Sequence, residues 1–211
     1  PYEFELGLGA AALASVKREF PAIRFLAANV KPAGDHRDLF EGRAIVELDG
    51  LKIGLFGIVD PDLRGLLAKS SLADFAFELP VDAAARETAA LRAAGADAVV
   101  MLSNLHPRDN AFVAREVAGI DAIVADLHVR WSPEATRTDI ELPGRPAVRP
   151  GSPALVARSF ANGLGVGRLD LGFRAGEGGR RHLAWLSHRL ESITDRTPPD
   201  AALVADLSAM A

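Results

Sequence analysis

The sequence contains no cysteine among its 211 residues. Disulfide bridges, zinc sites built from thiolates and thiol nucleophiles are therefore all excluded. Aromatic residues make up only 6% of the chain, and no apolar run approaches the roughly 20 residues that a membrane-spanning helix needs. The hydrophobic fraction of 49% and the charged fraction of 25% are those of a folded domain. We therefore expect a folded protein without a transmembrane segment.

An excess of positive charge is also missing. Lys and Arg together number 24 and Asp and Glu number 28, so the formal net charge is −4. Proteins that bind nucleic acid through bulk positive charge do so by releasing counterions from the phosphates. This composition has no basic excess for that purpose, so we expect no nucleic-acid partner of this kind.

The start of the chain lacks an initiator methionine, and no signal-peptide pattern follows Pro1. We expect either that a leader has been removed or that the chain is a piece of a longer protein. The length predicts a single domain over residues 1–211.

The pattern of helix formers and apolar runs predicts a mixed α/β fold. The dipeptide Asp49-Gly50 separates two apolar runs at 43–48 and 51–59 and predicts a β-hairpin, because both residues tolerate positive φ. Further strands are expected at 24–30, 97–103 and 120–125, followed by three antiparallel strands at 154–159, 167–173 and 182–190. Helices are expected at 8–18, 83–94, 109–118 and 201–209, with Asp82 and Asp109 as N-caps of the middle two.

The succession of strand, helix and strand over 97–125 predicts a parallel βαβ unit. Ligands of open α/β sheets bind beyond the carboxyl ends of such strands. Those ends carry four polar residues that could bind a metal: Asn104, His106, Asp126 and His128. Two histidines and a carboxylate are the minimum for a metal site, and polar residues also end strands without any such role, so both interpretations stay open.

Seven segments carry a family resemblance when they are taken in order. They are YEFELGL at 2–8, FLAANV at 25–30, LKIGLFG at 51–57, GADAVVMLS at 95–103, GIDAIV at 119–124, LGVGRLDL at 164–171 and TPPD at 197–200. Together they resemble the calcineurin-like metallophosphoesterase domain of the bacterial 5′-nucleotidase and UDP-sugar hydrolase family. The resemblance covers nearly the whole chain and corresponds to about the last two-thirds of that domain.

The resemblance implies a four-layer α/β/β/α sandwich with mixed sheets, its N-terminal part missing from these residues. It also implies an exported protein, periplasmic or otherwise extracytoplasmic. Active members of the family use two divalent metal ions to activate a water molecule against a phosphoester. A nucleotide or another phosphoester is therefore a possible ligand.

The resemblance also implies that the metal ligands are substituted. The family motif GNHE ends here as Pro1-Tyr2-Glu3, so proline replaces a metal-binding asparagine and tyrosine replaces a histidine. Asn104 stands where the family has a metal histidine, and the two histidines of the GHxH motif fall on Leu127 and Val129. Leucine and valine cannot bind a metal. The aspartates of the family's first two motifs would precede Pro1.

Two functional hypotheses follow. The first is a degenerate domain that serves as a non-catalytic binding or structural module and needs no cofactor. The alternative is an active phosphoesterase that uses Mn, Zn or Mg, is completed by an upstream segment, and draws on the displaced histidines His106 and His128. A third possibility, a module that docks on a protein partner, rests only on the lost ligands.

Overall fold

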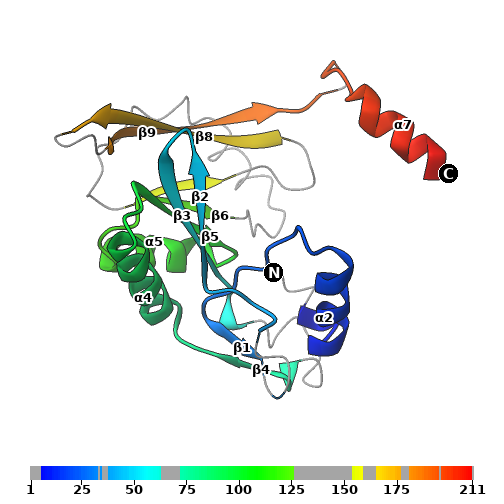
Figure 1. The fold of residues 1–211 in the computed structure, drawn as a ribbon, viewed down its shortest axis with the longest axis horizontal. Coiled ribbons are helices and arrows are strands. Elements are labelled where there is room, and N and C mark those ends of the chain that lie inside the picture. Colours follow the sequence, from blue (N-terminus) through cyan, green and yellow to red (C-terminus); the bar gives the residue numbers. More distant parts are fainter. Residues whose placement is uncertain are drawn as a thin grey trace.

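The computed structural model describes residues 6–32, 34, 38–62, 72–125, 154–158, 165–176, 181–194 and 196–210 (Figure 1). At its centre lies a five-stranded sheet with the strand order β2-β3-β5-β6-β7. The strands are β2 (Arg43–Leu48), β3 (Leu51–Ile58), β5 (Ala98–Ser103), β6 (Ala122–Ala125) and β7 (Leu155–Arg158).

The first two strands of the sheet form the predicted antiparallel hairpin. Asp49 and Gly50 take positive φ values of 50° and 76° in its turn. The predicted parallel pairing of β5 with β6 is confirmed, and β3 also runs parallel to β5. The sheet is therefore mixed, as expected.

The strand predicted at 154–159 is present, but the prediction that it is antiparallel is wrong. Its counterpart β7 pairs parallel to β6, with Leu155 opposite Ala122. A parallel neighbour needs a connection of about a dozen residues or more, and residues 126–154 provide that length. The alternation of side chains does not reveal strand direction, so the pattern alone misled the prediction.

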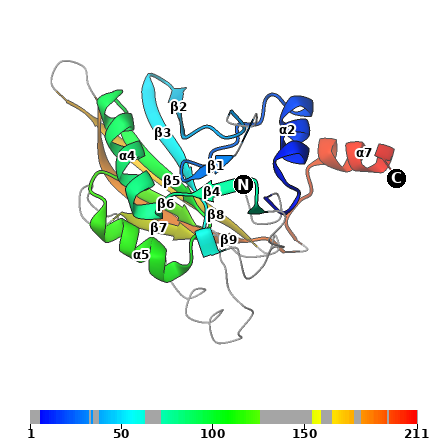
Figure 2. The ribbon, with the colours of Figure 1, turned by 90° about the horizontal axis from the view of Figure 1, so that it is seen from below.

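Two helices cover one face of the sheet (Figure 2). They are α4 (Pro80–Ala93) and α5 (Pro107–Glu116). A large apolar cluster joins them to the sheet, with Leu91 of α4 and Val113 of α5 packed among Phe56, Met101 and Ile123. Burial of this apolar surface is what holds the two layers together.

The predicted N-caps of both helices are wrong by three residues. The helix α4 begins at Pro80 with Leu79 as its N-cap, and α5 begins at Pro107 with His106 as its N-cap. Proline suits the first position of a helix because its missing N–H has no partner there in any case. Asp82 and Asp109 lie in the first turns, where their charge favours the helix dipole.

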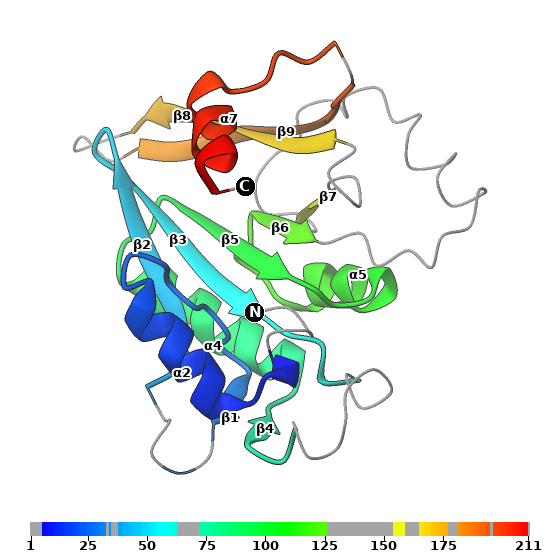
Figure 3. The ribbon, with the colours of Figure 1, turned by 90° about the vertical axis from the view of Figure 1, so that its right-hand side faces the viewer.

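The opposite face of the sheet carries a two-stranded ribbon made of β8 (Gly165–Ala175) and β9 (Arg181–Ser192). Leu169, Leu171 and Leu186 of this ribbon pack on Val100 and Leu155 of the sheet. The described residues thus form helix, sheet and ribbon layers in succession, and Figure 3 shows the ribbon against the sheet with α4 and α5 behind it.

A second apolar cluster lies at the other end of the ribbon-bearing face, around α2 (Ala10–Glu19). The short strands β1 (Val30–Pro32) and β4 (Phe75–Phe77) pair beside it. The strand predicted at 24–30 is present only as a bridge between Leu26 and Glu41 and as the start of β1. The backbone turns at residues 28–29, where the N–H of Val30 donates to the carbonyl of Ala27 at 3.3 Å.

The helix α7 (Ala201–Met210) extends away from the other elements (Figure 1). Its Leu203 and Val204 are exposed. Among the described residues, no helix combines the length and apolar character needed to cross a membrane.

Candidate functional site

The carboxyl ends of β3 and β5 lie next to each other, with Ile58 opposite Ser103 in the parallel register. The loops that follow these strands therefore meet at one edge of the sheet, which is where α/β sheets place their ligands. Asn104 and His106, two of the predicted site residues, lie in the second of these loops.

Asn104 is buried and joins the two loops. Its Oδ1 atom accepts a hydrogen bond of 2.7 Å from the backbone N–H of Asp60. The carboxylate of Asp60 in turn accepts from the backbone N–H of Asp62 at 2.8 Å, which closes an Asx turn. The amide oxygen is the only atom of Asn104 suited to a hard cation, and it is engaged by the backbone.

His106 caps the helix α5. Its Nδ1 atom accepts from the backbone N–H of Arg108 at 3.5 Å, at the outer limit of hydrogen bonding. The residue is exposed, and Pro107 follows it as the first residue of the helix. His106 is therefore the N-cap of α5, and its ring is exposed to solvent.

A buried network that the sequence analysis did not single out holds this loop in place. Ser103 Oγ lies 2.7 Å from Asn110 Oδ1 and accepts from the N–H of Leu105 at 3.0 Å. Asn110 Nδ2 donates to the carbonyl of Leu105 at 2.8 Å. The signal was available, since Asn110 shares a helical face with the apolar residues Val113 and Ala114. A polar side chain on the buried face of a helix needs a partner.

Asn29 plays a similar role beside the first loop. Its side chain is fully buried, accepts from the N–H of Val59 at 2.8 Å and donates to the carbonyl of the same residue at 2.7 Å. The amide thus pairs with the end of β3 as a neighbouring strand would. A polar residue inside the apolar run FLAANV was the signal for this contact.

Within the described ranges, no group of three or more His, Asp or Glu side chains is placed to hold a metal. The other predicted candidates, Asp126 and His128, lie outside the described residues, as do Pro1, Leu127 and Val129. What the described residues supply is a set of amides bonded to the backbone, two aspartate carboxylates in the loop after β3, and one exposed histidine.

Replacing Asn104 with alanine tests this structural role. The N–H of Asp60 would lose its partner in a half-buried position, so we expect the free energy of unfolding to fall by about 1–3 kcal/mol. Urea denaturation followed by circular dichroism measures the change. Asp62→Ala is the matched control, because Asp62 joins the turn through its backbone alone and should leave stability unchanged. Equal losses in the two variants would contradict the assignment.

Comparison with known proteins connects this fold to a group of phosphoesterases. No family model matches the chain. A protein of Treponema pallidum (strain Nichols) described as a "Probable 5′-nucleotidase" is 30% identical over 156 residues, which are 70% of this chain and 26% of that protein.

Two solved structures share the fold. The 5′-nucleotidase precursor of Thermus thermophilus superposes with a TM-score of 0.74 at 23% identity, covering 99% of this chain and 41% of its own. The calcineurin-like phosphoesterase YfkN of Bacillus subtilis superposes with a TM-score of 0.67 at 20% identity, covering 89% of this chain and 61% of its own. The chain therefore spans less than two-thirds of the length of each of these proteins.

Proposed function

Since the chain is a 5′-nucleotidase-like metallophosphoesterase domain, we propose that it is a degenerate member of that group, a non-catalytic binding or structural module of an exported protein. The observation that carries the proposal is the state of Asn104. The family resemblance puts a metal histidine at this position, and here its amide oxygen is buried and bonded to the N–H of Asp60. A side chain that fastens two loops has taken the place of a metal ligand.

The electrostatics of the substitution support the same conclusion. A divalent ion leaves its hydration shell only for several oxygen or nitrogen ligands, and carboxylates supply most of the energy. One neutral amide cannot hold two such ions. Leu127 and Val129, which fall at the histidines of the GHxH motif, add alkyl side chains where the chemistry needs donors. On this proposal the metallophosphoesterase fold is kept, but the side chains that would bind the catalytic metal ions are lost.

The proposal of export rests on the relatives. The matching Thermus thermophilus protein is described as a precursor, which fits a protein that is processed after synthesis. A chain without cysteine is also stable in an oxidising compartment. We place the domain in the periplasm or on the cell surface, where it would bind a nucleotide, another phosphoester or a protein partner.

One observation favours the alternative of an active, metal-dependent phosphoesterase. His106 is exposed at the carboxyl edge of the sheet, two residues beyond Asn104. An exposed imidazole there is available to a metal that an upstream segment helps to hold, and His128 and Asp126 would be further donors. This possibility is tested most directly by asking whether the protein, purified together with any segment that precedes residue 1, hydrolyses p-nitrophenyl phosphate or AMP in the presence of Mn²⁺.

Calorimetric titration with Mn²⁺ and Zn²⁺ separates the two functions. We expect no saturable heat with Mn²⁺ and no hydrolysis of p-nitrophenyl phosphate or AMP in its presence, because the described donors do not form a metal cluster. Two tight Mn²⁺ equivalents per chain would overturn the proposal. One weak Zn²⁺ equivalent that disappears in both His106→Ala and His128→Ala would support the alternative instead. The matched control is His182→Ala, which removes an exposed histidine on β9, far along the chain from both loops.

A further inference from the structure

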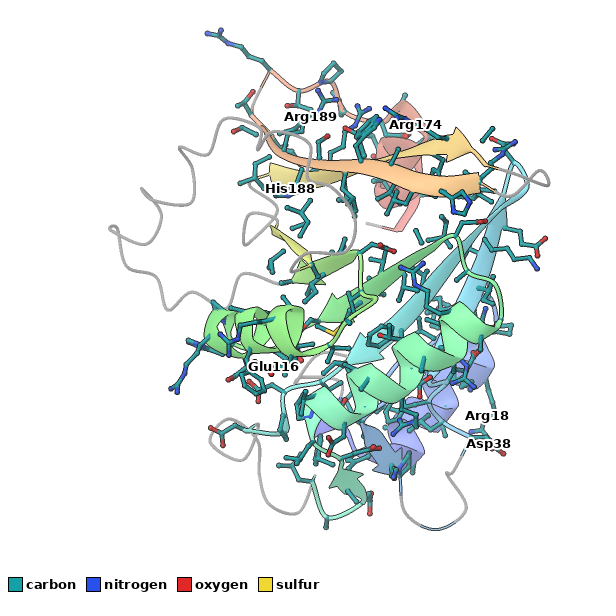
Figure 4. All side chains as sticks on the ribbon, turned by 90° about the vertical axis from the view of Figure 1, so that its left-hand side faces the viewer. Arg18, Asp38, Glu116, Arg174, His188 and Arg189 are labelled. Atoms are coloured by element: carbon teal, nitrogen blue, oxygen red, sulfur yellow. The ribbon has the colours of Figure 1, made fainter. Side chains whose placement is uncertain are left out.

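The end of β3 lies where the two larger apolar clusters of the described residues meet. Ile58 packs in the cluster of α4 and α5, whereas the next residue, Val59, packs in the cluster around α2. Figure 4 shows α4 in front of the sheet and α2 behind it. The loop that brings Asp60 to Asn104 starts at this boundary, so its position depends on how the segments on either side are held together.

Asn29 fixes the position of Val59 from a neighbouring segment. Its fully buried amide forms one hydrogen bond with the N–H of Val59 and another with the carbonyl of the same residue. An amide that donates and accepts at one partner can do so in only one orientation. A shift of Asn29 would break both bonds, so the path of the chain at Val59 follows the backbone at residues 28–29.

The backbone on both sides of Asn29 is held by Arg86 of α4. Arg86 Nη2 donates to the carbonyl of Ala28 at 3.0 Å, while the N–H of Ala28 donates to the carbonyl of Gly57 at 2.8 Å. Arg86 Nη1 donates to the carboxylate of Glu78. The N–H of Glu78 in turn donates to the carbonyl of Asn29 at 2.9 Å. One guanidinium thus holds the carbonyl before Asn29 directly and the carbonyl of Asn29 itself through Glu78.

A buried carboxylate orients Arg86. Its Nε atom donates to Oε1 of Glu87 at 3.0 Å, and Glu87 is only 3% exposed. The other carboxylate oxygen of Glu87 accepts from Arg43 of β2 at 2.5 Å. Burying a carboxylate costs free energy that an apolar residue in its place would not cost, so stability alone does not explain Glu87. Because a guanidinium is planar and rigid, a bond at Nε also fixes the directions in which its two terminal nitrogens donate.

We propose that Arg86 is a positioning residue for the carboxyl edge of the sheet. Through residues 28–29 it places Val59, and with Val59 the loop that follows β3. That loop brings Asp60 to Asn104. Arg86 therefore acts on this edge through other residues and does not lie at it. The inference concerns the geometry of the edge and holds whether or not the domain hydrolyses phosphoesters or binds a metal.

The attachment of α4 to the sheet does not require Arg86. Ala83, Ala84 and Leu91 of the same helix are fully buried in the apolar cluster that joins it to the sheet. Burial of these side chains holds the helix in place. Loss of the Arg86 contacts should therefore leave the helix packed and loosen residues 28–29. This difference separates a positioning role from a general contribution to stability.

Amide hydrogen exchange of the 211-residue chain, followed by NMR, tests the proposal. The variant Arg86→Lys keeps a positive charge, but its single nitrogen lacks the planar fork that serves three acceptors. We expect the amides of Val59 and Asp60 to exchange about tenfold faster, because this edge opens more easily when residues 28–29 are no longer fixed. The amide of Val99, near the start of β5, reports on the rest of the sheet and should change by less than about twofold.

The matched control is Arg43→Lys. Arg43 is the other partner of Glu87, and its side chain is 47% exposed against 45% for Arg86. Its hydrogen bond is to Glu87 and not to Ala28. We expect the two reporter amides at the end of β3 to keep their wild-type exchange rates within about twofold in this control. Arg86→Met removes all three contacts, so it should accelerate the same two amides more than Arg86→Lys does.

Thermal melts establish that the variants fold, and the exchange rates then decide the proposal. Faster exchange confined to Val59 and Asp60 in Arg86→Lys, and absent from Arg43→Lys, would support it. Unchanged exchange of these two amides in Arg86→Lys would overturn it. An equal rise at Val99 would also overturn it, because that marks a general loss of stability. So would an equal local effect in Arg43→Lys, since the ion pairs of Glu87 rather than the bond to the Ala28 carbonyl would then position the edge.

Discussion

The variant Gly57→Ala should lose about 3 kcal/mol or more of its free energy of unfolding, a cost at the upper end of that expected for overpacking. An added Cβ atom would lie 2.0 Å from the carbonyl oxygen of Leu26 and 2.6 Å from its carbonyl carbon. Neither atom can rotate away, because both belong to the backbone. The strand β3 and the segment around Leu26 would have to separate.

Separating β3 from the segment around Leu26 would also disturb neighbouring hydrogen bonds. The carbonyl of Gly57 accepts from the N–H of Ala28 at 2.8 Å, and the next residue, Asn29, pairs with both polar groups of the Val59 backbone. Displacing residues 26–28 therefore puts three buried hydrogen bonds at risk. Leaving buried polar groups without partners is among the costliest single changes in a folded protein.

A glycine on the same strand provides the matched control. A Cβ atom on Gly54 would meet Cδ2 and Cδ1 of Leu91 at 2.9 and 3.1 Å and Cβ of Ala96 at 3.2 Å, so its closest contacts are with the end of a flexible side chain and none is with the backbone. We expect Gly54→Ala to cost only about 1 kcal/mol, since a leucine can change rotamer within the core. Urea denaturation of the two variants gives both values. Similar losses would show that the close approach of the backbone at Gly57 is not what limits substitution there.

The elements that were predicted correctly depend on local chemistry. The turn at Asp49-Gly50 needs two residues with positive φ, and that requirement is visible in the dipeptide itself. The βαβ unit over 97–125 follows from a continuous apolar run, a helix and a terminating glycine, Gly119, whose φ is 95°. Each of these signals lies within a few residues of the feature that it predicts.

The features that were missed depend on residues distant in sequence. The direction of β7 is decided by its pairing with β6, across a connection that carries no strand pattern of its own. Asn104 was predicted at the correct edge of the sheet, but the use of its oxygen depends on Asp60, 44 residues earlier. One sequence does not show which backbone group will occupy a side chain. An asparagine can bind a metal in one protein and hold two loops together through a backbone hydrogen bond in another.

The second large effect is expected at Asp121, which fastens the helix α4 to the starts of two strands. Its Oδ2 atom accepts from the N–H of Val99 at 2.7 Å and from Arg92 Nη2 at 2.5 Å. Arg92 also donates to the carbonyl of Gly119 through two nitrogens, at 2.8 and 3.1 Å. One buried carboxylate thus connects α4, β5 and the turn before β6.

Burial raises the pKa of Asp121 above its ordinary value, although the hydrogen bond from Val99 and the charge of Arg92 both oppose the rise. The loss of hydration therefore outweighs the attraction of the pair, and the negative charge adds little net stability. Removing the side chain is a different matter, because it leaves a buried N–H and a fixed guanidinium without their acceptor.

We therefore expect Asp121→Ala to cost about 2–3 kcal/mol, below the range for a fully buried pair because Arg92 is about one-third exposed. The isosteric variant Asp121→Asn keeps an oxygen for Val99 and should lose less than half as much.

The pH dependence of stability tests whether burial of the Asp121 carboxylate is the cause. The folded protein takes up the proton of Asp121 at a higher pH than the unfolded chain does, so lowering the pH from 7 toward about 4 should stabilise the wild type relative to Asp121→Asn. Denaturation in urea at several pH values measures this difference, and a relative loss of wild-type stability on acidification would show instead that the ionised pair is the main source of stability at this position.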